Sequence, residues 1–115
     1  MKPNTQVISD RRAHDRFPLR TDVAVRLPDG RQIAGRTLDV GKGGMAIVID
    51  VNPTPGTAFV LRTRLPLRAG GSATFEAPAT VASCVLATAD GGFRVGLQFG
   101  TLAVPAQAAL KGFLP

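Results

Sequence analysis

The stretch FRVGLQF, residues 93–99, carries the most regular pattern in the chain. Every second residue is apolar, namely Phe93, Val95, Leu97 and Phe99. Because successive side chains of a β-strand point to opposite faces, this alternation predicts a strand with one buried and one exposed face. Gly91-Gly92 before the stretch and Gly100 after it predict turns at both ends. The fold is therefore expected to be built from strands.

Five further segments of similar character precede this strand. They are residues 23–27, 32–39, 45–49, 59–65 and 74–87. Turns rich in Gly and Pro separate them, and a bend is expected near Pro78 in the longest segment. Good helix formers follow Ala103, and Val104, Ala108 and Leu110 predict an apolar stripe on a helix. Six short antiparallel strands and one helix predict a small barrel or closed sheet that the helix caps.

The length of 115 residues leaves room for one domain. With 44% hydrophobic and 19% charged residues, the composition supports a packed core and argues against general disorder. No apolar run approaches the ~20 residues of a membrane span. The first ten residues, MKPNTQVISD, lack the apolar centre of a signal peptide. These features predict a cytoplasmic protein that does not insert into membranes.

Four arginines lie in the stretch DRRAHDRFPLR, residues 10–20. They are Arg11, Arg12, Arg16 and Arg20. A residue before proline is pushed out of the α region, so the Phe17-Pro18 pair ends any helix and starts an extended segment. We therefore predict a flexible N-terminal arm over residues 1–18 and a folded domain over residues 19–115. Guanidinium groups on such an arm suit planar, anionic, oxygen-rich partners.

The net charge of +6 indicates an anionic partner or surface. Nucleic acid, nucleotide, phospholipid and acidic protein all satisfy that requirement. The excess lies at the front, where residues 1–36 hold eight basic residues against four Asp. The chain has six Phe and no Trp or Tyr, which weakens any track of aromatic side chains for stacking bases. We therefore expect no DNA or RNA partner.

Catalytic and metal-binding constellations are absent from the sequence. His14 is the only histidine and Cys84 the only cysteine, so neither a metal cluster nor a Cys–His pair has support. Cys84 sits in an apolar run and is expected to be a small buried residue, while His14 is expected to be solvated. The sequence therefore predicts no enzyme, no metal and no cofactor.

A glycine-rich stretch, DVGKGG, occupies residues 39–44. Three glycines in four positions permit positive φ and let another group approach the backbone closely. A hairpin turn is the simplest interpretation of the stretch on its own. A phosphate-binding P-loop is excluded, because the glycine spacing differs and no Ser or Thr follows Lys42.

Two motifs, in this order, resemble those of the PilZ domain family. Residues 12–16 fit RxxxR, and residues 39–44 nearly fit [D/N]xSxxG. The resemblance covers essentially the whole chain, including the closing strand at residues 95–99 and the C-terminal helix. It implies a six-stranded antiparallel β-barrel with a C-terminal α-helix. It also implies that the ligand is the bacterial second messenger cyclic di-GMP.

The resemblance implies a ligand-binding site, which comprises Arg11, Arg12, Arg16, Asp39, Gly41 and Gly44. Arg12 and Arg16 match the family's two arginines, and arginine binds the O6/N7 edge of guanine, stacks on its face or pairs with phosphate. Asp39 matches an acidic position whose carboxylate accepts hydrogen bonds from guanine N–H donors. Gly44 matches the glycine that lets the nucleotide lie against the barrel.

Gly41 departs from the family pattern, which usually has serine there. The lost hydroxyl removes one hydrogen bond, roughly 0.5–1.5 kcal/mol or about two- to tenfold in affinity. Binding is thus expected to be weakened and not abolished. Gly41→Ser is expected to hold or raise the affinity, provided that the backbone there does not need positive φ.

Arg11 immediately precedes the RxxxR motif. Family members with arginine there tend to bind a stacked, intercalated pair of ligand molecules. A third guanidinium suits such a pair, because two ligands bring about four phosphate charges together. The resemblance thus implies a cyclic di-GMP dimer on each chain. The alternative is that Arg11 is one more solvated charge on the tail.

Three functions compete at this point. The first is a cyclic di-GMP receptor that changes its interaction surface and signals to a partner protein in motility, exopolysaccharide or virulence control. The second is a degenerate PilZ adaptor that binds a protein partner without nucleotide, which Gly41 favours and the retained Arg12, Arg16, Asp39 and Gly44 oppose. The third is a small basic barrel that binds RNA or DNA, and the missing aromatic platform opposes it.

Overall fold

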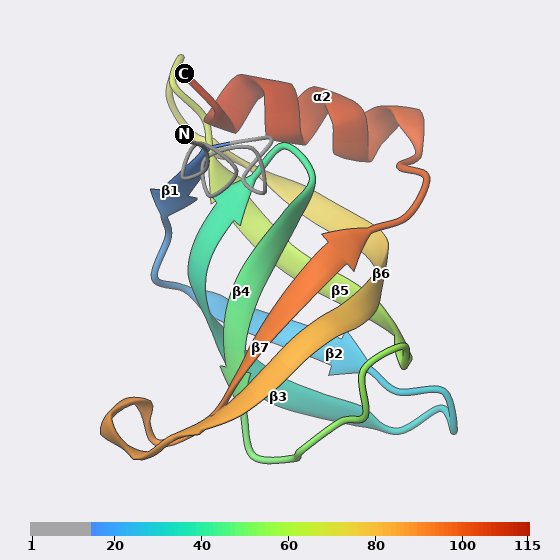
Figure 1. The fold of residues 1–115 in the computed structure, drawn as a ribbon. Coiled ribbons are helices and arrows are strands. Elements are labelled where there is room, and N and C mark those ends of the chain that lie inside the picture. Colours follow the sequence, from blue (N-terminus) through green and yellow to red (C-terminus); the bar gives the residue numbers. More distant parts are fainter. Residues whose placement is uncertain (1–14) are drawn as a thin grey trace, which may run out of the picture.

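In the computed structural model, which describes residues 15–115, every alternating segment forms a strand (Figure 1). The elements are β1 (Arg16–Pro18), β2 (Asp22–Arg26), β3 (Gln32–Gly41), β4 (Gly44–Ile49), β5 (Ala58–Pro66), β6 (Ser72–Ala87), the 3-10 turn η1 (Thr88–Asp90), β7 (Gly92–Phe99) and α2 (Val104–Phe113). Residues 15–115 contain no helix that is long and apolar enough to cross a membrane.

The strands close into a barrel. Their order is β3-β2-β5-β6-β7-β4, and each neighbouring pair is antiparallel. Strand β4 also pairs with β3, which closes the sheet into a barrel. The predicted six-stranded antiparallel barrel with a C-terminal helix is confirmed. A seventh strand, β1, pairs with the end of β3, and it consists of the last three residues of the predicted arm.

The inward side chains of the strands form one core. They are Val23, Val25, Val40, Met45, Ile47, Ile49, Phe59, Leu61, Leu65, Phe75, Ala77, Ala79, Val81, Val95 and Leu97. Most occupy every second position of their strand, as the alternation in the sequence predicts. Burying each large side chain contributes about 1.5–3 kcal/mol, so this interior is the main source of stability.

Helix α2 covers one end of the barrel and packs against β5 and β6 (Figure 1). Its buried residues are Ala106, Ala109 and Leu110, which follow helical spacing. The predicted stripe was wrong at Val104, which is 75% exposed, and at Ala108, which is also exposed. Alanine occurs on more than one side of this helix, so the sequence is compatible with two apolar faces. Only the packing against β5 and β6 determines which of them is buried.

Two irregularities interrupt the regular ladders. In β3 the register shifts between Thr37 and Asp39, which places Leu38 in a bulge. A bulge inserts one extra residue and so breaks the period-two alternation of inward and outward side chains in this strand. In β6 the shift lies between Val81 and Ser83, a few residues beyond the predicted bend near Pro78.

Thr37 anchors the segment that joins β1 to β2. Its side chain is fully buried, donates a hydrogen bond from Oγ1 to the Leu19 carbonyl and accepts one from the Thr21 N–H at 3.0 Å. Backbone hydrogen bonds from Leu19 to Leu38 and from Thr37 to Thr21 complete the connection. The path of the chain into β1 is therefore fixed by the barrel wall.

Replacing Thr37 with the isosteric valine is expected to lower the free energy of unfolding by about 1–3 kcal/mol. The change leaves a buried backbone carbonyl and a backbone N–H without their partner. Urea denaturation measures the loss, with Thr80→Val on the exposed side of β6 as the control. Equal stabilities of the Thr37→Val protein and the wild type would contradict this account.

Candidate functional site

Two residues of the predicted site meet although 23 positions separate them. Strand β1 lies beside the end of β3, with Arg16 opposite Gly41 and Pro18 opposite Asp39. This register places the Arg16 guanidinium nitrogen Nη1 2.8 Å from Asp39 Oδ1, in a hydrogen-bonded ion pair. Both side chains are about one-third exposed, at 34% and 35%. A pair so open to water contributes little stability, and both groups remain accessible to a ligand.

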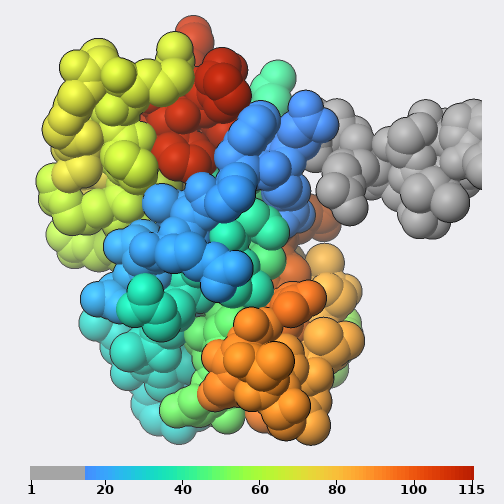
Figure 2. All heavy atoms as spheres, turned by 90° about the vertical axis from the view of Figure 1, so that its left-hand side faces the viewer, coloured from blue at the N-terminus to red at the C-terminus, as the bar shows by residue number. Residues whose placement is uncertain are grey.

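The other predicted arginines precede this pair along the chain. Arg11, Arg12 and His14 lie outside the described residues, so their positions in the site stay predictions. Of the RxxxR motif, the structure describes Asp15 and Arg16, and Arg16 begins β1 beside the end of β3. Figure 2 shows this face, where the first described residues, in blue, lie over the teal strand β3.

Residues 41–44 form the hairpin turn that the sequence indicated, since β3 ends at Gly41 and β4 begins at Gly44. Neither glycine has a positive φ. Gly41 and Gly44 are instead positions where neighbouring atoms leave no room for a Cβ. A Cβ on Gly41 would lie 2.6 Å from the Asp15 carbonyl oxygen and 2.8 Å from Arg16 Cδ, so glycine lets β1 approach β3 closely.

Gly44 is needed by the barrel itself. A Cβ at this position would overlap the carbonyl oxygen of Leu97 on β7, and Leu97 is part of the core. Gly44 pairs with Gln98, so its backbone is held directly against the neighbouring strand. Tight pairing of β4 with β7 therefore accounts for this glycine without any ligand.

The geometry at Gly41 changes the expected result of Gly41→Ser. The backbone condition is met, because φ is not positive, but the new Cβ would push against backbone at Asp15. We therefore expect Gly41→Ser to displace β1 and to lower stability by about 1–3 kcal/mol, the usual cost of overpacking. Gly41→Ala separates the two effects, since it adds the Cβ without the hydroxyl. Chemical denaturation and ligand titration of both variants check this, and a serine variant as stable as wild type would refute it.

The outer face of the barrel beside Asp39 is unusually flat. Across the strands, Asp39 is opposite Ala46 on β4, Ala46 is opposite Gly96 on β7, and Gly96 is opposite Ser83 on β6. No side chain in this row beyond Asp39 is larger than that of serine. The surface beside the carboxylate therefore carries no bulky side chain from this row, although Ala46 itself is only 9% exposed. Sequence reasoning missed Ala46, Gly96 and Ser83, because only the strand register brings them into line.

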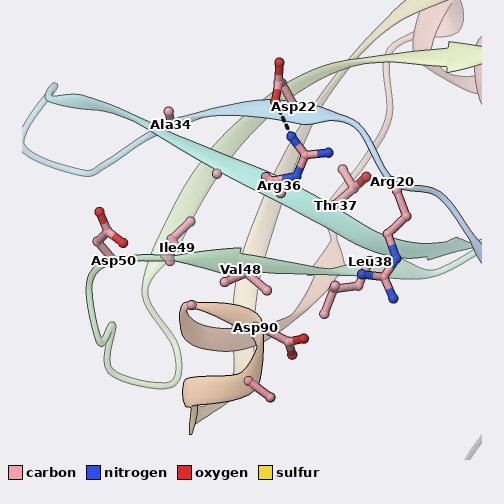
Figure 3. Close-up of a pocket in the computed structure, with 13 residues that line it drawn as sticks. Arg20, Asp22, Ala34, Arg36, Thr37, Leu38, Val48, Ile49, Asp50 and Asp90 are labelled. Carbon is pink, nitrogen blue, oxygen red and sulfur yellow. Dashed lines mark hydrogen bonds and ion pairs between the residues drawn. The ribbon is translucent and has the colours of Figure 1, made fainter.

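A groove of about 500 Å³ adjoins this site along β3. It lies between the outer surface of β2, β3 and β4 and the turn η1, and Figure 2 shows it as the hollow between the blue and teal residues and the orange ones. In Figure 3 the Arg20 side chain reaches toward Leu38, and Arg36 is hydrogen bonded to Asp22 at 2.9 Å. The lining of the groove extends along β3 to Leu38, the residue before Asp39, and includes neither Arg16 nor Asp39.

The charges of this groove do not favour an anion. Its charged lining residues are Arg20, Asp22, Arg36, Asp50 and Asp90. Arg36 is already paired with Asp22, and Asp90 accepts from Arg94 at 2.8 Å. Two arginines against three aspartates leave no positive excess, so this groove offers no net attraction to phosphate groups.

Comparisons with known proteins agree with this fold. Residues 10–114 match the family described as the PilZ domain. No curated protein matches the chain. The match includes the arginine-rich segment, the hairpin between β3 and β4, and the whole barrel with its helix.

Solved structures share the barrel at low sequence identity. The Bacillus subtilis inhibitor of motility MotI/DgrA superposes with a TM-score of 0.72 at 22% identity, over 88% of this chain and 48% of that one, so the chain spans about half of that protein's length. The PilZ domain of YcgR from Escherichia coli, determined with c-di-GMP, gives 0.63 at 17% identity over 88% and 86%. The PilZ domain of CeSA from a cellulose-synthesizing bacterium gives 0.59 at 20% over 84% and 91%.

Proposed function

We propose that this chain, which belongs to the PilZ domain family, is a receptor for cyclic di-GMP that signals to a partner protein. Domains of this family are receptors or adaptors and not enzymes. The observation that carries the proposal is the accessible Arg16–Asp39 pair, which joins the last residue of the RxxxR motif to the first residue of the glycine-rich stretch. A cation and a carboxylate, side by side and each about one-third exposed, match the acceptor and donor edges of one guanine.

The chemistry of each group suits this ligand. The Arg16 guanidinium donates two hydrogen bonds in a fixed fork, which fits guanine O6 and N7, and it also pairs with phosphate. The Asp39 carboxylate accepts from the N–H groups of guanine. The small residues Ala46 and Gly96 add no bulky side chain that would keep a planar ring from the strands beside Asp39. Arg11 and Arg12 then neutralise phosphates from the other side of the ligand.

Binding would reorganise the site, because Arg16 and Asp39 are partners before the ligand arrives. A guanine that takes hydrogen bonds from Arg16 and donates to Asp39 replaces their mutual contact by contacts of its own. Of the predicted arm of residues 1–18, the last three are held in β1. We propose that the residues before β1 close over the ligand and present a new surface to a partner protein. The likeness to an inhibitor of motility supports motility as an output, with exopolysaccharide and virulence control as others.

A second candidate function is supported by one observation. The Arg16–Asp39 pair is satisfied without ligand, and Gly41 supplies no hydroxyl, which is what an adaptor that has lost nucleotide binding would show. Such an adaptor would bind its protein partner by the same face without cyclic di-GMP.

Isothermal titration with cyclic di-GMP at about 0.15 M ionic strength tests the proposal, since that salt screens weak long-range attraction. We expect saturable binding. Cyclic di-AMP is the matched control, because adenine presents a different donor and acceptor pattern, and it should bind at least tenfold more weakly. No binding of either dinucleotide would favour the adaptor. Equal binding of both, or tighter binding of a single-stranded oligonucleotide, would refute guanine recognition.

Two molecules of cyclic di-GMP are expected to bind each chain, and Arg11→Ala is expected to reduce this number to one. Three guanidinium groups offset the repulsion of about four phosphate charges, and two do so less well. Titration of protein at known active concentration gives the ratio, with Lys2→Ala as a control that removes an equal charge elsewhere in the arm. A ratio of one in both wild type and Arg11→Ala would refute the role of Arg11.

A further inference from the structure

One part of the barrel has a strand edge whose backbone pairs with no other strand among residues 15–115. The segment between β4 and β5 reaches it through a side-chain hydrogen bond, which Cys84 Sγ donates to Asn52 Oδ1 at 3.1 Å. Strand β6 pairs with β5 up to Thr80, and two backbone hydrogen bonds between Val81 and the segment at Gly56 and Thr57 end the contact on that side. Beyond them β6 continues to Ala87 with β7 as its neighbour on the other side. Residues 82–87 therefore present unpaired backbone donors and acceptors to solvent. In Figure 1 this hairpin of β6 and β7 projects from the lower left of the barrel.

The edge lacks most of the devices by which proteins protect such strands. Its sequence is ASCVLA, without charge or proline, and the bulge at Ala82 lies only at its start. Val85 is 56% exposed and Leu86 is 66% exposed, and they are two of the three large apolar side chains that are exposed in the described chain. Val85 is opposite Arg94 and Leu86 opposite Phe93, so both faces of the hairpin carry apolar surface at this edge.

The distribution of charge allows a second copy of this chain to approach the edge. Two molecules of net charge +6 repel each other over most of their surfaces. At this hairpin the charges are balanced, because Arg94 and Asp90 form an ion pair at 2.8 Å and residues 77–89 carry no charge. An antiparallel strand pair about a two-fold axis is self-complementary, since each chain offers the other the same donors and acceptors.

We infer that residues 82–87 are a self-association site, at which a second copy of this chain adds its own β6 edge in antiparallel orientation. The two hairpins then form one continuous sheet, and Val85 and Leu86 of both copies become covered. The contact is small, at the low end of interface sizes, so the dimer is weak, with a Kd of roughly 10 μM to 1 mM. Its apolar centre, Val85 and Leu86, lies farther along β6 than Ser83, the residue that ends the row of small side chains beside Asp39. The association uses neither Arg16 nor Asp39, so it does not require the proposed ligand.

A charge exchange at Val85 tests the inference. In a two-fold antiparallel pairing centred on Cys84 or Val85, the two copies of Val85 lie on the same face of the joined sheet, within about 10 Å of each other. Like charges there repel at low salt. Sedimentation equilibrium from about 10 μM to 1 mM is expected to show a monomer–dimer equilibrium for wild type. Val85→Glu and Val85→Lys should each weaken the dimer at least tenfold, and their equimolar mixture should restore it. Val85→Glu faces Arg94 of its own chain, which keeps the hairpin folded.

Val104→Glu is the matched control, because Val104 is exposed and apolar but lies on α2, away from the hairpin. It should leave the dimer unchanged. Amide hydrogen exchange of residues 82–87 should slow as the protein concentration rises. A wild type that stays monomeric at 1 mM would overturn the inference. So would a dimer that survives Val85→Glu, or one that is lost in Val104→Glu.

Discussion

Arg16→Ala is expected to weaken cyclic di-GMP binding by about 10- to 150-fold, and Arg12→Ala by a similar factor. Each removes a charged hydrogen-bond donor to the ligand, worth about 1.5–3 kcal/mol, which converts to that range of affinity. For Arg16 the structure gives a second reason to expect a large loss of affinity. The side chain is already held at the rim of the barrel, 2.8 Å from Asp39, so little freedom is lost when the ligand takes it over.

Arg31→Ala is the matched control for Arg16→Ala. Arg31 also forms an ion pair at 2.8 Å, with Asp29 in the turn between β2 and β3, and the substitution changes the net charge equally. If Arg16 acts by direct contact, the Arg31 variant binds like wild type. Equal losses in the two variants would show that general positive charge attracts the ligand. Undiminished binding by both Arg12→Ala and Arg16→Ala would remove the proposed site.

The fold was largely predictable because its strands bury one face each. Alternation at Val23 and Val25, or at Val95 and Leu97, follows directly from a barrel with an apolar interior. The strand β1 was not predictable. Its three residues include a proline, and its pairing with β3 is a contact between distant segments that leaves no local pattern. The face of α2 was missed for a related reason, since alanine occurs on both sides of the helix.

For the candidate site, motifs gave the residues but not their arrangement. The sequence indicated Arg16 and Asp39, and the structure joins them in one ion pair. The sequence did not indicate that a side chain at Gly41 would collide with Asp15, or that one at Gly44 would collide with Leu97. A local sequence gives no information about what a neighbouring strand places next to a glycine. The flat row at Ala46 is hidden in the same way, because it exists only across strands.

Gly44→Ala is expected to destabilise the fold severely, by about 3 kcal/mol or more. The new methyl group would overlap the Leu97 carbonyl, and that obstacle is backbone, which no side-chain rotation can remove. Overpacking typically costs about 1–3 kcal/mol even where side chains can adjust, and a domain of this kind has only about 5–15 kcal/mol in total. Loss of ligand binding in this variant would therefore reflect unfolding of the β4–β7 contact and not a clash with the nucleotide.

Gly96→Ala is the control that isolates this effect. Gly96 lies on β7 near Gly44, but a Cβ there would meet only the Ser83 hydroxyl, at 2.7 Å, which can turn away. We expect that variant to lose less than about 1 kcal/mol. Urea denaturation of the two variants beside wild type measures the difference, and thermal unfolding should show a midpoint lower by roughly 10 °C or more for Gly44→Ala. If the two alanine variants prove equally stable, β4 and β7 have room to separate, and Gly44 then serves the ligand instead of the barrel.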